Sequence, residues 1–152
     1  MISQIFAMVI LIAIGIPLSY WVRKAQLDGF ELWLPFGIII GIAISPVAGF
    51  FFAIIMKVGA WFVFPFDLNT LGILTFDLAV TMFMITLLSF TPATLVFYSV
   101  LLVVFFNIIS NILFLFLGFD PMKSMKFAAF SIWLTWLITS NWGWGLVEFF
   151  SI

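Results

Sequence analysis

Hydrophobic residues occur along this chain in five long segments, and short stretches between them hold most of the polar and charged residues. Each segment has about 20 to 25 residues, the length that an α-helix needs to cross the ~30 Å hydrocarbon core of a bilayer. We therefore predict five transmembrane helices, at residues 2–22, 32–56, 71–90, 93–117 and 127–146. Residues 58–70 place Trp61 and several Phe side chains around Pro65, a pattern typical of a segment at the membrane interface.

The second segment contains Ser45-Pro46, which leaves two interpretations open. In a continuous helix Pro46 predicts a kink. A chain that turned back there would make the segment re-entrant and leave four spanning helices. With five simple spans, three Lys or Arg residues lie on one side and two on the other, so the positive-inside rule does not decide the orientation. The re-entrant alternative would put the basic loops at 23–24 and 123–126 together on the cytoplasmic side.

The composition excludes a soluble globular domain. Of the 152 residues, 66% are hydrophobic and 7% are charged, with a net charge of −1. A soluble domain carries roughly 25% charged residues, so this chain has too few polar side chains to cover a surface in water. The predicted fold class is all-α: a polytopic integral membrane protein that forms a single transmembrane helical domain over residues 1–152.

The absence of Cys and His removes many kinds of chemistry. Disulfides, haem held by His, Cys/His zinc sites and Ser-His or Cys-His nucleophiles are excluded. An intramembrane aspartic protease needs two Asp residues, and only Asp77 lies inside a hydrophobic segment. Five dispersed basic residues provide no electrostatic basis for nucleic-acid binding. We expect a protein that is not an enzyme and holds no metal or cofactor.

Small residues recur at every fourth position of the second segment, and we call them the small-residue ridge: Gly37, Gly41, Ser45, Gly49 and Ala53. This spacing places them on one face of a helix, where they allow another backbone to approach closely. Such close contacts hold helices together in lipid, where no hydrophobic force drives association. The ridge predicts helix packing, either within the chain or against a second copy or another subunit.

A second set of residues forms a candidate polar site: Lys57, Asp77, Thr81, Asn107 and Asn111. Asp77 lies six residues into the third segment, a depth at which a charge is costly. Lys57 would lie near the same interface, so a Lys57–Asp77 ion pair is one hypothesis. The alternative is that each side chain extends to its own interface.

The polar residues form stripes on three predicted helices. Thr81 lies one turn after Asp77 on the same face. The other two stripes are Asn107 and Asn111 with Ser110 beside them, and Ser131, Thr135 and Thr139. These side chains are suited to hydrogen bonds between helices, worth ~0.6 kcal/mol each on average. Alternatively, the stripes line a narrow polar path or a small-solute site.

Three short motifs are notable: Gly29, Trp33-Leu34, Gly37 and Ser45-Pro46; Thr75-Phe76-Asp77-Leu78; and Ile132-Trp133, Trp136 and Ser140. Together they resemble a family of small bacterial membrane proteins of unknown function that opens with a Gly-Gly-Trp-Leu signature. The chain departs from that family in two places: Glu31-Leu32 precedes Trp33, and Trp142-Gly143 follows the closing motif in place of Arg-Val. The resemblance implies a four-helix unit with an extra first helix, located in the bacterial inner membrane, and it implies no activity.

These observations predict a non-catalytic integral membrane protein that is an accessory or assembly subunit of a membrane complex. Its expected partners are the lipid bilayer and other membrane subunits, or a second copy bound through the small-residue ridge, with no nucleic acid. The alternative is a small oligomeric channel or transporter with a polar path near Asp77, Asn107 and Asn111. A lipid-handling protein with a lateral opening between its helices is a third possibility.

Overall fold

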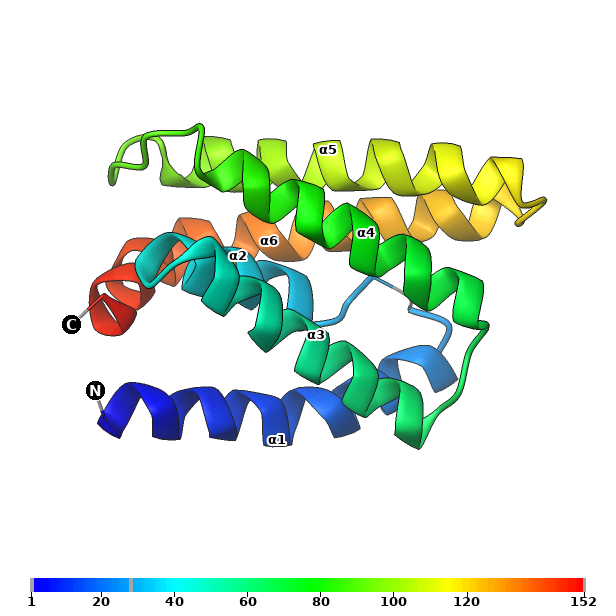
Figure 1. Cartoon of the computed structure of the whole chain (residues 1–152), viewed down its shortest axis with the longest axis horizontal. Helices are drawn as coiled ribbons and strands as arrows, with labels where there is room; N and C mark the ends of the chain where they lie inside the picture. The colour runs from blue at the N-terminus through cyan, green and yellow to red at the C-terminus, as the bar shows by residue number, and fades with distance from the viewer. Residues whose placement is uncertain (1, 28, 152) are drawn as a thin grey trace.

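The computed structural model describes residues 2–27 and 29–151, and within these ranges the chain forms helices and no strand (Figure 1). The predicted all-α class is confirmed. The helices are α1 (Ile2–Lys24), α2 (Trp33–Ala43), α3 (Pro46–Val63), α4 (Leu68–Ile85), α5 (Leu95–Phe116) and α6 (Pro121–Phe150). Four of them, α1, α3, α4 and α5, are long and apolar enough to cross a membrane. The long α6 runs beside α5 (Figure 1).

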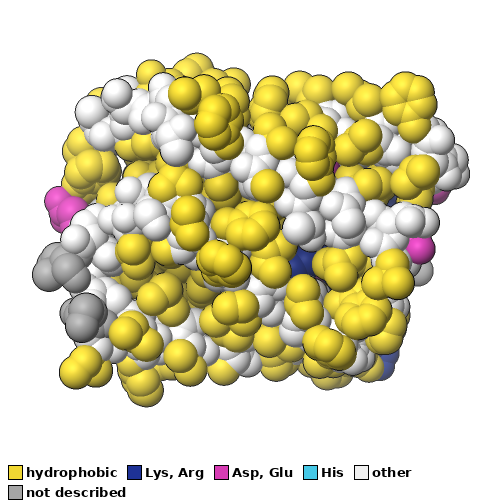
Figure 2. Space-filling model, in the orientation of Figure 1, with side chains coloured by type: hydrophobic (Ala, Val, Ile, Leu, Met, Phe, Trp, Pro, Cys, Tyr) yellow, Lys and Arg dark blue, Asp and Glu magenta, His cyan; other side chains and the backbone are white. Residues whose placement is uncertain are grey.

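The surface of the helix bundle is apolar. Hydrophobic side chains cover most of the face shown in Figure 2. Phe116 and Phe62, for example, expose 83% and 72% of their surface. A soluble protein rarely exposes apolar patches of this extent, whereas hydrocarbon solvates them. Together with the four apolar helices, this surface indicates a multi-pass membrane protein.

The second predicted span is not one helix, because it breaks at Ser45-Pro46. Ser45 has an extended backbone, and its hydroxyl accepts a hydrogen bond from the backbone N–H of Ala48 at 3.2 Å. Pro46 then occupies the first position of α3, where a helix needs no N–H donor. The Ser-Pro pair therefore starts a new helix rather than kinking an existing one. The chain turns back here, as in the alternative interpretation, and the expectation of one helix over residues 32–56 is wrong.

The small-residue ridge lies inside the hairpin that α2 and α3 form. A Cβ atom on Gly49 would lie 2.3 Å from the carbonyl oxygen of Gly37 and 2.6 Å from the Cα of Gly41. A Cβ atom on Gly37 would lie 2.9 Å from that of Ala53. Because the ridge is symmetric about Ser45, the turn folds its two halves against each other. The ridge thus packs within the chain.

Helix α2 is the central element of the bundle. Eight of its 11 residues are buried, and it contacts α3, α4, α5 and α6. It begins near the middle of the bundle's length and runs toward the end at which α1 begins (Figure 1). Residues 25–32 connect α1 to this starting point. Non-helical backbone therefore enters the interior of the bundle.

Two other boundaries differ from the sequence prediction. The expected interfacial segment 58–70 is divided between the end of α3 and the start of α4. Only residues 64–67 connect the two helices, and the Trp61 indole donates a hydrogen bond to the carbonyl oxygen of Phe66 at 2.8 Å. Helix α6 starts at Pro121 because the Asp120 side chain accepts from the N–H of Met122 at 3.0 Å and so caps the helix.

Four of the five basic residues lie in the last turn of α1 or the first turns of α6, and the fifth lies six residues before the end of α3. The residues are Arg23, Lys24, Lys57, Lys123 and Lys126. The end of α1, the end of α3 and the start of α6 all lie toward the same end of the bundle (Figure 1). We call this the basic end. It results from the turn at Ser45-Pro46, which returns α3 to the side of the α1–α2 connection.

Candidate functional site

A buried cluster of charged residues lies inside the basic end, with Glu31 at its centre. The Arg23 guanidinium, from the end of α1, donates through Nε to Oε1 of Glu31 at 2.8 Å. The Lys57 ammonium, from α3, donates to Oε2 at 2.7 Å. The Trp33 indole N–H, from the first residue of α2, also donates to Oε2. Glu31 is only 3% exposed. One carboxylate therefore links three helices, and we call this the Glu31 cluster.

Aromatic rings surround the two cations of the Glu31 cluster. The Arg23 guanidinium lies 4.1 Å from the centre of the Phe66 ring. The Lys57 ammonium lies 4.7 Å from the centre of the Trp33 ring and 5.3 Å from that of Phe66. Ring faces attract cations, and the attraction grows when water is removed. These contacts partly replace the water that the two cations lose on burial.

The cluster holds Glu31 in its ionised form. Burial raises the pKa of this carboxyl, but the charges and hydrogen bonds of Lys57 and Arg23 lower it by more. The net result is a pKa of about 2, compared with an ordinary 4.5. The cations therefore outweigh desolvation. Glu31 is therefore held in its negatively charged form at physiological pH.

The Glu31 cluster forms part of the wall of a cavity of about 670 Å³ at the basic end. Besides the three cluster residues, the charged residues that line this cavity are Asp67, Asp120, Lys123 and Lys126. Four of the chain's five basic residues thus face the same space. We call it the basic cavity.

The connection between α1 and α2 shapes one side of the basic cavity. Gly29 has a backbone φ of +102°, and a Cβ atom there would lie 2.3 Å from the carbonyl oxygen of Phe127. A residue with a side chain would be strained and would collide with the start of α6. Glycine lets the connection lie against α6 while it carries Gln26 and Glu31 to the cavity wall.

A short helix that begins inside the bundle has consequences for ligand binding. The first N–H groups of a helix carry a partial positive charge and have no partners within the helix. Helix α2 begins two residues after Glu31, next to the basic cavity. In membrane proteins, non-helical backbone at depth occurs where it is buried in protein or lines a water-filled space. Broken helices of this kind form the solute sites of many transporters.

The predicted polar site is divided between separate places in the structure. Lys57 belongs to the Glu31 cluster. Asp77, on α4, instead accepts a hydrogen bond from the Ser110 hydroxyl on α5. The structure does not bring Lys57 and Asp77 together, so the predicted pair is replaced by Lys57–Glu31. Thr81 donates to the backbone oxygen of Asp77 at 2.8 Å, within its own helix.

The polar stripe of α5 connects to two neighbouring helices rather than to one path. Asn107 donates to the Ser131 hydroxyl on α6 at 2.9 Å, whereas Ser110 donates to Asp77 on α4. Asn111 is only partly buried. Within residues 2–27 and 29–151, none of Asp77, Asn107 and Asn111 lines the basic cavity or a smaller cavity between α5 and α6. The expected convergence of these three side chains on one path is therefore not formed.

Glu31 was not predicted as a site residue because it lies in a short polar loop beside Arg23 and Lys24. Its role depends on the depth at which α2 begins, which the hydrophobic pattern does not reveal. One local signal was present. Glu31 directly precedes the apolar run that begins at Leu32-Trp33, and an acid at the start of a helix interacts favourably with the positive end of the helix dipole.

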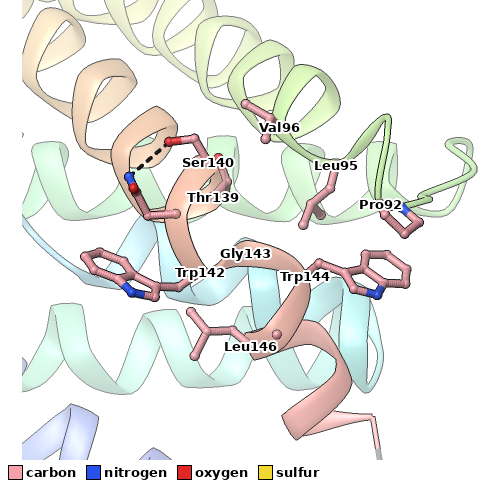
Figure 3. A pocket seen from close by; sticks show the side chains of 11 residues that line it. Pro92, Leu95, Val96, Thr139, Ser140, Trp142, Gly143, Trp144 and Leu146 are labelled. Carbon is pink, nitrogen blue, oxygen red and sulfur yellow. Dashed lines mark hydrogen bonds between the residues drawn. The ribbon is translucent and has the colours of Figure 1, made fainter.

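The smaller cavity, of about 450 Å³, lies at the opposite end of the bundle between α5 and the last turns of α6 (Figure 3). Among the residues that the structure describes, those lining it carry no charge. The side chains of Trp142 and Trp144 point in opposite directions from α6 and do not converge on a ligand (Figure 3). The polar side chains of Ser140 and Asn141 bond to each other at 3.2 Å. This cavity lacks the chemistry of the basic cavity.

Comparison with known proteins adds no further information: no family model, curated protein or solved structure matches this chain. The resemblance to the Gly-Gly-Trp-Leu family stays a prediction. Its opening motif coincides with structural features here, since Gly29 lies in the connection that carries Glu31, Trp33 binds Glu31, and Ser45-Pro46 forms the hairpin turn. Function is therefore inferred from the geometry of the basic cavity.

Proposed function

We propose that the protein is a small membrane transporter without catalytic chemistry, which binds a small anion in the basic cavity. The observation that carries this proposal is the Glu31 cluster: three ionised groups buried inside a membrane protein on the wall of a cavity. Lys57 lies six residues before the end of α3, which is about 9 Å along the helix axis. Ionisable residues at such depth are costly and mark solute or ion pathways in membrane proteins.

The lining of the basic cavity favours an anion as the solute. It contains four of the five Lys and Arg side chains of the protein against three carboxylates, those of Glu31, Asp67 and Asp120. Arg23 uses Nε and Nη1 for its hydrogen bonds within the described ranges, so Nη2 can donate to a ligand. A guanidinium group binds carboxylate and phosphate oxygens with good geometry.

The distribution of charge also supports an orientation. Arg23 and Lys24 at the end of α1 and Lys123 and Lys126 at the start of α6 lie at the basic end, and cytoplasmic loops carry an excess of Lys and Arg. We infer that the basic cavity opens to the cytoplasm. The resemblance noted above supports the bacterial inner membrane as the location.

The expectation of an accessory or assembly subunit has lost one of its two supports. It rested on the lack of catalytic groups and soluble parts, and on the small-residue ridge as a surface for another subunit or a second copy. In the structure Gly37, Gly41 and Gly49 contact one another across the α2–α3 hairpin. A partner that used this surface would have to open the hairpin. We therefore prefer the alternative made from the sequence, a channel or transporter, and move its site from Asp77 to the Glu31 cluster.

The proposal is tested by anion binding and flux with the purified protein. Phosphate and acetate, with glucose and an alkylammonium salt as controls at equal ionic strength, are added while the melting temperature in detergent is measured. At least one anion is expected to raise the melting temperature, and the same anion is expected to enter proteoliposomes. The Lys126→Gln variant, which changes an exposed lysine of the cavity lining, is expected to weaken both effects several-fold.

Lys24→Gln provides the matched control. Lys24 adjoins Arg23 in sequence, but its ammonium lies over the Tyr20 and Trp21 rings and it does not line the basic cavity. This variant is expected to behave as wild type. Equal losses in Lys24→Gln and Lys126→Gln would indicate a general surface-charge effect and contradict the proposal. A wild-type protein that neither binds nor transports a panel of small carboxylates and phosphates would also contradict it.

A further inference from the structure

Asp77 is an acidic residue in the middle of α4, and the Glu31 cluster does not explain it. It lies nine residues after the start of α4 and eight before its end, so it is about 12–14 Å from either end of the helix. Half of a bilayer's hydrocarbon core is about 15 Å thick, which places Asp77 near the membrane centre. Its surface is 0% exposed. Oδ2 accepts from the Ser110 hydroxyl, and Oδ1 has no hydrogen-bond partner among the described residues.

The helices that pack against α4 provide no cation for Asp77. Helix α2 contains no titratable side chain, and α5 contains only Tyr98, twelve residues before Ser110. Helix α3 contains Lys57, whose ammonium is bonded to Glu31. Within the described ranges the ion pairs of the protein are those of the Glu31 cluster. An ionised carboxylate without a cation is very costly in such a place, and buried groups of this kind become neutral instead.

Asp77 is also close to the basic cavity, with one layer of side chains between them. Leu74 lies three residues before Asp77 on α4, and Phe114 lies four residues after Ser110 on α5. This spacing places each on the same helix face as its polar neighbour, one turn nearer the basic end. Both side chains are buried, and both line the basic cavity. Leu74 and Phe114 therefore form an apolar barrier about one helical turn thick between the cavity and the Asp77–Ser110 pair.

We propose that Asp77 is a proton-binding site, reached from the basic cavity past Leu74 and Phe114, and that its protonation accompanies movement of the anion. Water in the cavity delivers the proton: an O–H bond breaks on a hydronium ion and forms on the carboxylate. A proton and a monovalent anion that cross together carry no net charge. The coupling rests on the function proposed above, whereas the protonated state of Asp77 does not.

The protonated state is tested directly by infrared spectroscopy of the intact protein in proteoliposomes at neutral pH. The expected result is a carbonyl band of a protonated carboxylic acid that is lost in Asp77→Asn. In Ser110→Ala the band is expected to stay and to shift to higher frequency, because a hydrogen bond to the carboxyl is lost. A spectrum without this band in folded wild-type protein would overturn the proton site.

The barrier is tested by the rate at which a hydrophobic carbodiimide, which reacts with protonated carboxyl groups, labels Asp77. Leu74→Ala is expected to admit water, favour the ionised carboxyl and lower the labelling rate at neutral pH about tenfold. Leu78→Ala is the matched control, because Leu78 is equally buried beside Asp77 but does not line the cavity. Equal rates in the two variants would overturn the barrier.

Coupling is tested by anion flux into proteoliposomes with and without a pH gradient. We expect an inward proton gradient to raise the flux of wild type several-fold and to have no effect on Asp77→Asn. If the pH gradient does not change anion flux in wild type, the coupling is overturned while the proposed transport function stands. If no anion moves but the infrared band is present, the proposed function fails and the proton site stands.

Discussion

Glu31 and Asp77 are both almost completely buried carboxyl groups, yet they differ in every other respect. Two cations and an indole N–H bind Glu31, and the group faces a cavity. Asp77 has one hydroxyl partner and lies behind two apolar side chains. The comparison shows that burial alone does not determine how a carboxyl group is stabilised. The surroundings decide whether a cation or a proton neutralises it.

The difference follows from the position of each residue along the chain. Glu31 lies in a non-helical connection, which can bring it to side chains from α1, α2 and α3 at once. Asp77 lies within a helix, so its position is determined by packing against α3 and α5 and its partners are those that these helices present. Variants at and around each carboxyl separate the two cases, and they are taken below in order of decreasing effect.

The largest effect is expected from Glu31→Gln. The amide keeps the shape of the side chain but removes the negative charge between Arg23 and Lys57. Breaking one partner of a buried ion pair typically costs about 3–5 kcal/mol, because it leaves uncompensated charge inside the protein. Unfolding by a denaturing detergent measures the loss. Glu148→Gln is the control, since that exposed carboxylate also accepts from an indole, at 2.7 Å. A loss below about 1 kcal/mol would contradict the role of the Glu31 cluster.

The second effect is a dependence on pH. Because the pKa of Glu31 is lowered to about 2 in the folded protein, its ionised form stabilises the fold above about pH 4.5. This contribution falls as the pH drops from about 5 to about 2, and amounts to about 3 kcal/mol. Wild type is expected to lose this stability on acidification and Glu31→Gln is not. Parallel curves for the two proteins would show that Glu31 is not held ionised.

Gly29→Ala is expected to disturb Glu31 and leave Asp77 unchanged. The positive φ and the contact with Phe127 oppose any Cβ atom, with a cost of about 1–3 kcal/mol. The infrared band of Asp77 should stay in place while the acid dependence weakens. Gly72→Ala is the control, because a Cβ atom there meets no neighbour within 4 Å. If both glycine variants were equally stable, the close contact of the connection with α6 would be refuted.

Ser110→Ala removes the hydroxyl that binds Asp77. Hydrogen bonds between membrane helices contribute about 0.6 kcal/mol on average and about 1.7 at most, so a loss of roughly 1 kcal/mol is expected. The same unfolding assay detects it. Ser140→Ala, at an exposed serine that bonds within α6, should change stability less.

The smallest effect is expected from Asp77→Asn, because a neutral amide resembles a protonated carboxyl in shape and charge. The change in unfolding free energy is expected to stay below about 0.6 kcal/mol. This contrasts sharply with Glu31→Gln, although both variants replace a buried acid with its amide. A loss of several kcal/mol in Asp77→Asn would indicate an ionised Asp77 paired with a cation, and would remove the contrast between the two carboxyls.

The hydrophobic pattern predicts the boundaries of some helices well and misses others. Long apolar segments placed α1 and α5 almost as observed, because lipid requires a continuous helix of hydrophobic residues. The same pattern joins α2 and α3, because residues 32–56 contain no charged residue to mark the turn. Ser45-Pro46 is compatible with both a kink and a turn, and its capping hydrogen bond forms only when α3 begins there.

The apolar pattern and composition establish the class of protein, the all-helical fold and the candidate polar residues other than Glu31, because few arrangements can satisfy so apolar a chain in a bilayer. Which of these residues meet depends on the tertiary structure. The α2–α3 hairpin packs the small-residue ridge between its own two helices, and it returns α3 to the basic end. This brings Lys57 into contact with Glu31. Ion pairs and cavities depend on where helices begin and how they cross, and these are set by packing among segments distant in the chain.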